Sequence, residues 1–197
     1  GKNLRGGINW KYRAPGEDEW MIEMLATNDT VWGWAEQFLG EGSLVRPKNI
    51  RGIYCRMPEG DLPERVLDCH CDGHPFHVGI VGLIDHVPPN GGAFTVWPRS
   101  HRTFYHAFTK RYAHERAEGY DEHIEHFNGQ PSVDCHGEAG DIVFWHHRMA
   151  HAARPNRSRQ IRQAVLYDFR KLDWEETQDL PPHDDMWADW SEEMQAM

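Results

Sequence analysis

The chain has 197 residues, a length that fits one domain with a sizeable core. No stretch approaches the roughly 18 apolar residues of a membrane-spanning helix, so we expect no membrane partner. A formal net charge of -10 argues against binding along nucleic acid, which relies on clustered Lys and Arg. The expected partner is a small-molecule substrate, and the oligomeric state is not indicated.

Four cysteines are too few for a disulfide scaffold in a chain of this length. We therefore expect reduced thiols and a cytoplasmic protein. The first residues contain no apolar signal-peptide core. Because the chain opens at Gly1-Lys2-Asn3, we suspect a truncated start or a lost leader.

Apolar residues at helical spacing predict a helix over residues 17–26. A second helix is expected to begin at a cap on Asp29 or Thr30 and to end at Gly40. The acidic tail after Asp173 also carries apolar residues at helical spacing, namely Met186, Trp187, Trp190 and Met194. This pattern predicts a C-terminal helix packed on the rest of the fold.

Short runs rich in β-forming residues follow one another through the middle of the chain. They cover residues 49–57, 66–72, 76–86, 92–98, 132–136, 141–147 and 161–169. Clusters of Pro, Gly and Asn separate them, and regularly spaced short strands of this kind predict a sandwich or a closed double sheet. The polar stretch 103–128 is expected to hold one helix and a loop.

The segment 67–72 (LDCHCD) places a histidine and a carboxylate two residues apart. Side chains alternate between the two faces of a strand, so His70 and Asp72 project to one face and Cys69 and Cys71 to the other. This alternation argues against a zinc site built from Cys69, His70, Cys71 and His74, and no second Cys-x-x-Cys pair exists to complete one.

A second segment, 140–151 (GDIVFWHHRMAH), supplies further imidazoles. Its three candidate ligands are His146, His147 and His151. Arginines follow two of them at the same spacing of eleven residues, Arg157 after His146 and Arg162 after His151. Arg162 lies within an apolar run and needs a buried anion more than Arg157, which sits in a polar turn. The pairing of His151 with Arg162 is therefore favoured.

Together the two segments resemble the phytanoyl-CoA dioxygenase family of Fe(II)/2-oxoglutarate oxygenases. The resemblance extends from about residue 49 to 169 and includes His70-Cys-Asp72, the stretch 88–101 (PPNGGAFTVWPRSH), Gly140-Asp141, His151, Pro155-Asn156, Ser158 and Arg162. It implies a mainly β fold, a double-stranded β-helix (jelly roll) with flanking helices. We expect a single domain over 1–197, with a core at about 49–170 and helical flanks at 15–40 and 183–196.

The resemblance also implies roles for particular residues. His70, Asp72 and His151 would bind Fe(II), and Arg162 would pair with the distal carboxylate of 2-oxoglutarate. The activity implied is hydroxylation of a small organic molecule with O2, as 2-oxoglutarate is converted to succinate and CO2. Because Asp72 is present, the chain resembles a hydroxylase more than the related halogenases, which have a small residue there.

The chain departs from the family pattern at several positions. Ala153 stands where a small hydroxyl residue often helps to hold the co-substrate. The turn that usually reads Pro-Gly-Ser-His is Pro98-Arg-Ser-His101. The helical region before the first core strands is also short. None of these departures removes a predicted ligand.

Other residues are weaker candidates. Arg51 and Arg56 lie on a predicted strand just before the ligand strand, and one of them is a candidate for the inner carboxylate of 2-oxoglutarate. The candidates for co-substrate binding are Arg56 and Thr95. The candidate substrate-pocket residues are Tyr54, His74, Phe76, His77 and Trp97. Thr95 and Trp97 share a face of their predicted strand, so one of them is expected to line the cavity. For His74, a role in orienting a metal ligand and a simple turn position are both open.

Two other classes of function fit part of the pattern. One is a non-catalytic jelly roll that binds a metal, and the other is a cupin-type metal enzyme that does not use 2-oxoglutarate. Arg162 argues against the cupin, because such sites need no guanidinium in the barrel. Succinate formation separates an oxygenase from the non-catalytic protein.

Overall fold

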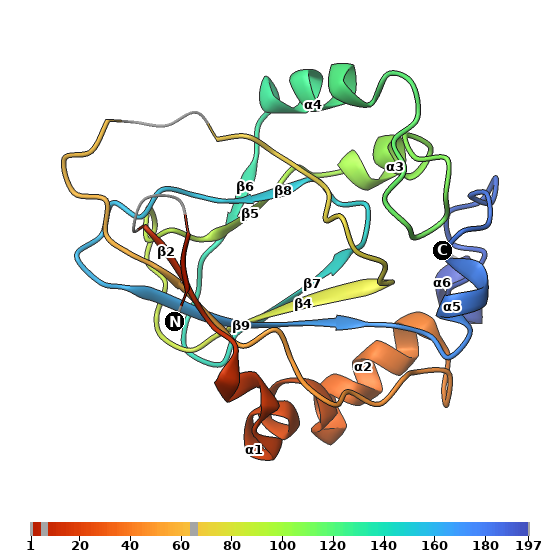
Figure 1. The fold of residues 1–197 in the computed structure, drawn as a ribbon, viewed down its shortest axis with the longest axis horizontal. Helices are drawn as coiled ribbons and strands as arrows, with labels where there is room; N and C mark the ends of the chain where they lie inside the picture. The colour runs from red at the N-terminus through yellow and green to blue at the C-terminus, as the bar shows by residue number, and fades with distance from the viewer. Residues whose placement is uncertain (1, 5–7, 64–66, 197) are drawn as a thin grey trace.

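The structure is a computed structural model that describes residues 2–4, 8–63 and 67–196. Two antiparallel sheets form its centre (Figure 1). The large sheet has the order β1 (Lys2–Leu4), β2 (Asn9–Tyr12), β3 (Ile53–Arg56), β9 (Arg162–Phe169), β4 (Val78–Leu83) and β7 (Ile142–His146). The small sheet has the order β6 (Val133–Cys135), β5 (Phe94–Val96) and β8 (His151–Ala153). The arrangement confirms the predicted jelly roll.

The strands differ from the sequence-based expectation at two places. The expected strand 66–72 is reduced to one isolated bridge, His70 with His151, and its first residue, Val66, lies outside the described residues. The segment contains few apolar β-formers and meets a neighbour only at that residue. Strand β8 was not expected, because Met149-Ala-His-Ala-Ala153 lacks β-branched residues.

The N-terminal helices cover the outer face of the large sheet. They are η1 (Ala14–Glu17), α1 (Glu19–Ile22), the π-helix η2 (Glu23–Thr27) and α2 (Asp29–Leu39). The expected cap of α2 is displaced by one residue, since the Asn28 side chain accepts a hydrogen bond from the Val31 amide at 3.0 Å. Gly40 ends the helix with a φ of +104°, as predicted.

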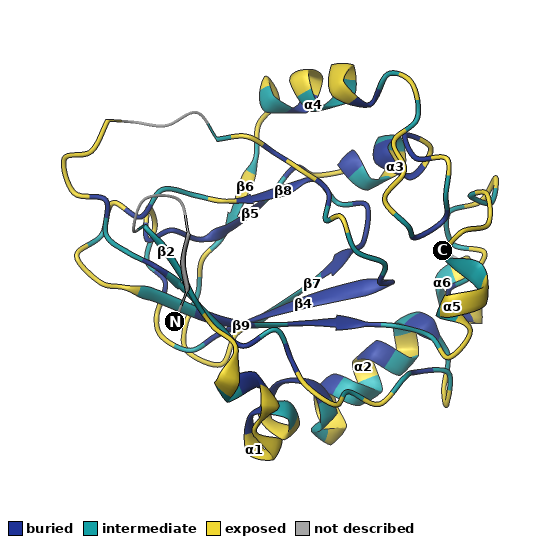
Figure 2. Ribbon diagram, in the orientation of Figure 1, coloured by how far each residue is buried: buried dark blue, intermediate teal, exposed yellow. Residues whose placement is uncertain are grey.

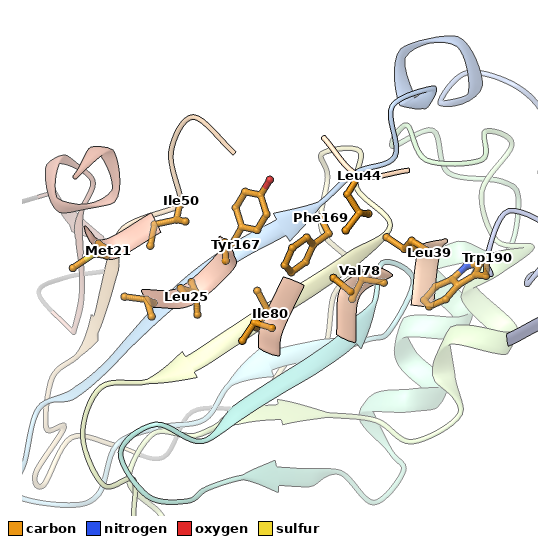
Figure 3. Packing of buried hydrophobic residues seen from close by; sticks show 14 residues of the cluster. Met21, Leu25, Leu39, Leu44, Ile50, Val78, Ile80, Tyr167, Phe169 and Trp190 are labelled. Carbon is orange, nitrogen blue, oxygen red and sulfur yellow. The ribbon is translucent and has the colours of Figure 1, made fainter. Parts of the chain in front are cut away.

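Apolar side chains fill the layer between these helices and the large sheet. Figure 3 shows Met21 and Leu25 above the strands that carry Ile80 and Tyr167. The helix α2 turns its buried residues toward the sheet, and all of β4 is buried (Figure 2). Strand β4 is continuously apolar because helices cover one of its faces and the interior of the sandwich the other.

Two helices, not one, lie over the small sheet: α3 (Ser100–Tyr105) and α4 (Tyr120–Asn128). Between residues 171 and 196, the described end of the chain, only α5 (Trp174–Thr177) and α6 (Glu192–Gln195) are helical. The expected C-terminal helix is therefore limited to its last turn, although Trp190 is buried and stacks on His146. Within the described chain no helix has both the length and the apolar character to span a membrane.

A third apolar cluster lies between the two sheets, and Trp145 is at its centre. The indole packs on Phe94 at 5.0 Å and on Phe76 at 6.0 Å between ring centroids. Trp145 pairs with Gly79 across the β4–β7 ladder, and a Cβ on Gly79 would lie 2.1 Å from the indole ring. Glycine at this position therefore allows the indole to lie flat across the neighbouring strand.

We expect Gly79→Ala to destabilise the protein by about 1–3 kcal/mol, because the buried indole has no space to move away from the new methyl group. Gly33→Ala is the matched control. A Cβ at Gly33, inside α2, meets nothing within 4 Å, so this variant should gain about 0.5–1 kcal/mol from helix propensity. Urea denaturation of both variants measures the two effects. Equal stability of the two variants would contradict this account of Trp145.

Candidate metal centre

Two backbone hydrogen bonds join the segments that carry the predicted ligands. The His70 amide donates to the His151 carbonyl oxygen and the His151 amide donates to the His70 carbonyl oxygen, both at 3.0 Å. Residues paired in this way project their side chains to the same face. The two imidazole rings accordingly lie 4.5 Å apart between centroids.

The carboxylate of Asp72 completes the group. Its Oδ1 atom lies 3.9 Å from Nε2 of His70 and 3.7 Å from Nε2 of His151. The three ligand atoms all lie within 4.8 Å of one another, a separation suited to a shared metal ion. Two imidazoles and one carboxylate on one side of a cation leave several coordination positions free, as in non-haem Fe(II) oxygenases.

The neighbouring cysteines point away from this group, as strand alternation predicts. Cys69 and Cys71 are buried in the apolar cluster beneath α3 and α4. Burial raises the pKa of the Cys71 thiol to about 12 and that of Cys69 to about 11, so both stay protonated. Since zinc is bound by thiolates, the structure gives the Cys-His zinc alternative no support.

His151 is held in the orientation and tautomer that a metal ligand needs. Its Nδ1 atom lies 2.9 Å from the Met149 carbonyl oxygen, which can only accept, so Nδ1 carries the proton. Nε2 therefore faces Asp72. The ring is buried against Phe94 and Trp145, at 5.2 and 5.9 Å between centroids.

The other two candidate histidines of this segment lie elsewhere. His146 and His147 are buried at the end of β7, and His146 stacks on Trp190 at 5.2 Å between ring centroids. Burial lowers the pKa of each imidazole well below its ordinary value. Of the three histidines, the structure brings only His151 next to Asp72 and His70.

Asp72 is ionised, and its Oδ2 atom is bound by Arg51. Burial by itself would raise its pKa, but in the metal-free site a proton on Nε2 of His151, together with the Arg51 guanidinium, lowers it well below its ordinary value; a metal bound to Nε2 would take the place of that proton. Nη1 of Arg51 lies 3.3 Å from Oδ2 of Asp72. Oδ1 thus faces the two imidazoles while Oδ2 is bound to Arg51, which favours a monodentate ligand.

A cavity of about 160 Å³ lies beside the three ligands, between the two sheets. Its lining residues include Arg51, Tyr54, His70, Asp72, Val81, Phe94, Trp145, His151, Ala152, Ala153, Arg162 and Leu166. Tyr54, a predicted pocket residue, therefore lies at the cavity wall. Ala153, the position that departs from the family pattern, also lies there. The remaining walls are largely apolar and come from both sheets.

Arg162 enters this cavity from the start of β9. Its Nε atom donates to the Gly92 carbonyl oxygen at 2.8 Å, which fixes the side chain. Burial and the neighbouring Arg56 guanidinium lower the pKa of Arg162 to about 10. Among the ion pairs of the described residues none involves Arg162, so its terminal nitrogens are available for an anion.

Several predicted residues do not line this cavity. Arg56 lies across the strand ladder from Arg162, but its guanidinium is bound to Asn9 and Glu59, each at 2.7 Å. Thr95 donates to Asp134 at 2.7 Å, and Trp97 packs in the cluster under α3 and α4. Thr95 and Trp97 do share a face of their strand, but it is the face opposite Phe94, which lines the cavity.

The three predicted residues after the ligand turn also lie outside the cavity. Phe76 is buried between the sheets and stacks on His74 at 5.0 Å between ring centroids. His77 faces Tyr112 at 4.0 Å, and burial lowers its pKa to about 3. His74 bonds to Asp168 at 2.8 Å, so the structure places it beside the ligand group and not at the cavity wall.

Asp168 and the position of Arg51 were missed by sequence reasoning. Nε of Arg51 lies 3.4 Å from Oδ2 of Asp168, so one guanidinium joins this carboxylate to Asp72. The available signal was a carboxylate within the apolar run of β9, because a buried charge requires a partner. Nothing local in the sequence indicated which cation that partner is.

A model of the family described as "Phytanoyl-CoA dioxygenase (PhyH)" matches residues 63–164, slightly more than half of the chain. No curated protein sequence matches. Among solved structures, HygX from Streptomyces hygroscopicus with nickel, 2-oxoglutarate and hygromycin B bound is similar at a TM-score of 0.56 and 13% identity. That match covers 92% of this chain and 83% of HygX.

The epimerase SnoN, in complex with Fe3+, alpha ketoglutarate and nogalamycin RO, is similar at a TM-score of 0.56 and 19% identity. The match covers 92% of this chain and 78% of SnoN. EvdMO1 matches at a TM-score of 0.44 and 20% identity over 67% of this chain, but the chain spans only 28% of its length. The similarities to HygX and SnoN show the fold. The family model, which spans the ligand segments and Arg162, shows that the chain belongs to the phytanoyl-CoA dioxygenase family.

Proposed function

We propose that this protein is an Fe(II)/2-oxoglutarate-dependent dioxygenase that hydroxylates a small organic molecule. One observation carries the proposal: the ligand atoms of His70, Asp72 and His151 converge within 4.8 Å at a cavity that also contains Arg162. Three donors leave coordination positions for a co-substrate and O2, and the guanidinium supplies the charge that a dicarboxylate needs.

The residues present fit the metal. His70 and His151 offer neutral nitrogen donors and Asp72 an ionised oxygen donor, a set that suits Fe(II). The Met149 carbonyl fixes the tautomer of His151, and Arg51 holds the oxygen of Asp72 that faces away from the imidazoles. These two contacts orient the ligands before a metal arrives, which raises metal affinity.

The residues present also fit 2-oxoglutarate. Arg162 is partly buried, anchored through Nε and without a carboxylate partner in the described chain, so its remaining donors match the distal carboxylate. Val81, Phe94, Trp145 and Leu166 form apolar walls around that position. Such walls exclude water and strengthen the pairing of Arg162 with its carboxylate.

When bound, iron and 2-oxoglutarate supply the oxidation itself: O2 is consumed, the co-substrate is converted to succinate and CO2, and one oxygen atom enters a C–H bond of the substrate. The protein's part is to hold the ligands, orient the co-substrate and keep the cavity dry. The presence of Asp72 as a third protein ligand supports hydroxylation over halogenation. SnoN, which shares this fold, is an epimerase, so the fold alone does not determine the outcome at the substrate.

Replacing Asp72 with alanine should lower succinate formation more than about 100-fold, because it removes a ligand and not only a residue that orients one. The same variant should lose tight binding of Co(II), measured by its visible absorption. Asp184→Ala, at an exposed aspartate far from the cavity lining, is the matched control and should behave as the wild type. Full turnover by the Asp72→Ala protein would refute the ligand assignment.

Replacing Arg162 with methionine should raise the KM for 2-oxoglutarate about 10- to 100-fold, the effect of losing a charge-assisted pair. It should also abolish the preference for 2-oxoglutarate over 2-oxobutyrate, which lacks the distal carboxylate. Arg102→Met, at an exposed arginine, is the control. Succinate and 2-oxobutyrate-derived propionate are quantified by chromatography. An unchanged preference in the Arg162→Met protein would favour a metal enzyme that does not use 2-oxoglutarate.

A further inference from the structure

A second and larger cavity of about 570 Å³ adjoins the candidate metal centre. Its walls come from β2, the segment 45–51 before β3, the turn at His74 and the end of β9. A volume of this size falls within the range of small-molecule sites. We name it the basic cavity, after the six cations in its lining: Lys11, Arg13, Arg46, Lys48, Arg51 and Arg170.

The charge of this lining is opposite to that of the whole chain. Six cations face two carboxylates, Glu17 and Asp168, in a protein with a formal net charge of -10. Asp168 is already bound to Arg51 and to His74, at 3.4 and 2.8 Å. Most of the positive charge in the basic cavity therefore has no balancing carboxylate in its lining.

Two of the cations, Arg46 and Arg170, lie against aromatic rings that do not neutralise them. Arg46 lies over the ring of Trp32 at 4.8 Å, and Arg170 lies over the ring of Trp174 at 4.7 Å. Among the ion pairs of the described residues, Arg51 is the member of this group that has carboxylate partners. Cation–π contacts orient a guanidinium and leave its charge available.

The pKa of Lys11 is lowered by its burial and by its position among these cations. Its Nζ lies 4.1 Å from the centroid of the Tyr54 ring. Burial, together with the charges of Arg51 and Arg13, lowers the pKa of Lys11 to about 8. A bound anion would offset the repulsion from Arg51 and Arg13 that adds to the effect of burial on Lys11, and this favours binding of an anion beside it.

The basic cavity is connected to the metal centre through shared residues. Arg51 lines both cavities and contacts the ligand Asp72. Tyr54 lines the metal cavity, and its ring is in cation–π contact with Lys11 of the basic cavity. A molecule in the basic cavity would thus be separated from the predicted metal ligand Asp72 by the side chain of Arg51 alone.

We propose that the basic cavity binds the anionic part of the substrate, and that the substrate is a small organic molecule with a multiply charged anionic group such as a phosphate ester. This inference rests on the proposed function, since it places the uncharged part of the same substrate at the metal centre. Arg162 stays reserved for the co-substrate, because it lines the metal cavity and not the basic one.

Calorimetric titration of the whole chain with inorganic pyrophosphate, in the presence of a chelator that keeps the protein metal-free, tests the anion site without reference to turnover. We expect Arg46→Gln/Lys48→Gln, which removes two exposed cations of the lining, to weaken binding about 10- to 100-fold. The matched control is Arg102→Gln/Arg159→Gln, which removes the same charge from exposed positions outside the lining and should bind as the wild type. Far-ultraviolet circular dichroism and thermal melting establish that both variants are folded.

Equal affinity of the wild type and the Arg46→Gln/Lys48→Gln protein would overturn the proposal, and so would displacement of pyrophosphate by saturating 2-oxoglutarate. Substrate class is tested with pairs of phosphorylated metabolites and their dephosphorylated counterparts, scored by stimulation of succinate formation. Stimulation by the phosphorylated members, reduced in the Arg46→Gln/Lys48→Gln protein, supports the proposal; stimulation by neutral members to the same extent defeats it. Pyrophosphate binding without any succinate formation would support the anion site and refute the oxygenase, so the two failures are distinguishable.

Discussion

The pair of reciprocal backbone hydrogen bonds between His70 and His151 is the constraint on which the rest of the site depends. It joins two segments that are about eighty residues apart and sets their side chains on one face. Asp72, two residues after His70, lies on the same side, and the Met149 carbonyl accepts a hydrogen bond from Nδ1 of His151. Backbone pairing brings the two imidazoles together, and Arg51 holds the carboxylate that completes the group.

Aromatic packing behind the site also fixes the position of the His151 ring. Gly79 leaves room for the Trp145 indole, and that indole with Phe94 forms the wall against which His151 lies. The imidazole is thereby confined from one side by aromatic rings and from the other by its hydrogen bond. A ligand confined in this way loses little side-chain entropy when it binds a metal.

The sequence predicts the ligand group better than it predicts the cavity around it. Period-two alternation is a local property, so it placed His70 and Asp72 together and the two cysteines opposite. It likewise placed Thr95 and Trp97 on a common face, but it does not state which face meets the interior. That depends on how the small sheet packs, and α3 and α4 cover the side that carries Trp97.

Contacts between distant segments also explain the other differences. Arg51 and Asp168 lie far apart in the chain, and only the fold shows that one guanidinium holds two carboxylates. Strand β8 exists because β5 offers it a partner, and its own residues carry little β propensity. The C-terminal tail has the spacing of a helix, yet its tryptophans are held by aromatic contacts with His146 and Phe38.

The position of Arg51 gives the protein a thermodynamic property beyond the separate sites. The Arg51 guanidinium contacts the carboxylate of Asp72, a predicted metal ligand, and also lines the basic cavity. An anion in the basic cavity that pairs with Arg51 would weaken the contact of Arg51 with Asp72 and leave this carboxylate a stronger electron donor. A metal bound to Asp72 would weaken the same contact from the other side. Because such coupling is reciprocal, an anion in the basic cavity would change the affinity of the three donors for a metal, and a bound metal would change the affinity for the anion by the same factor.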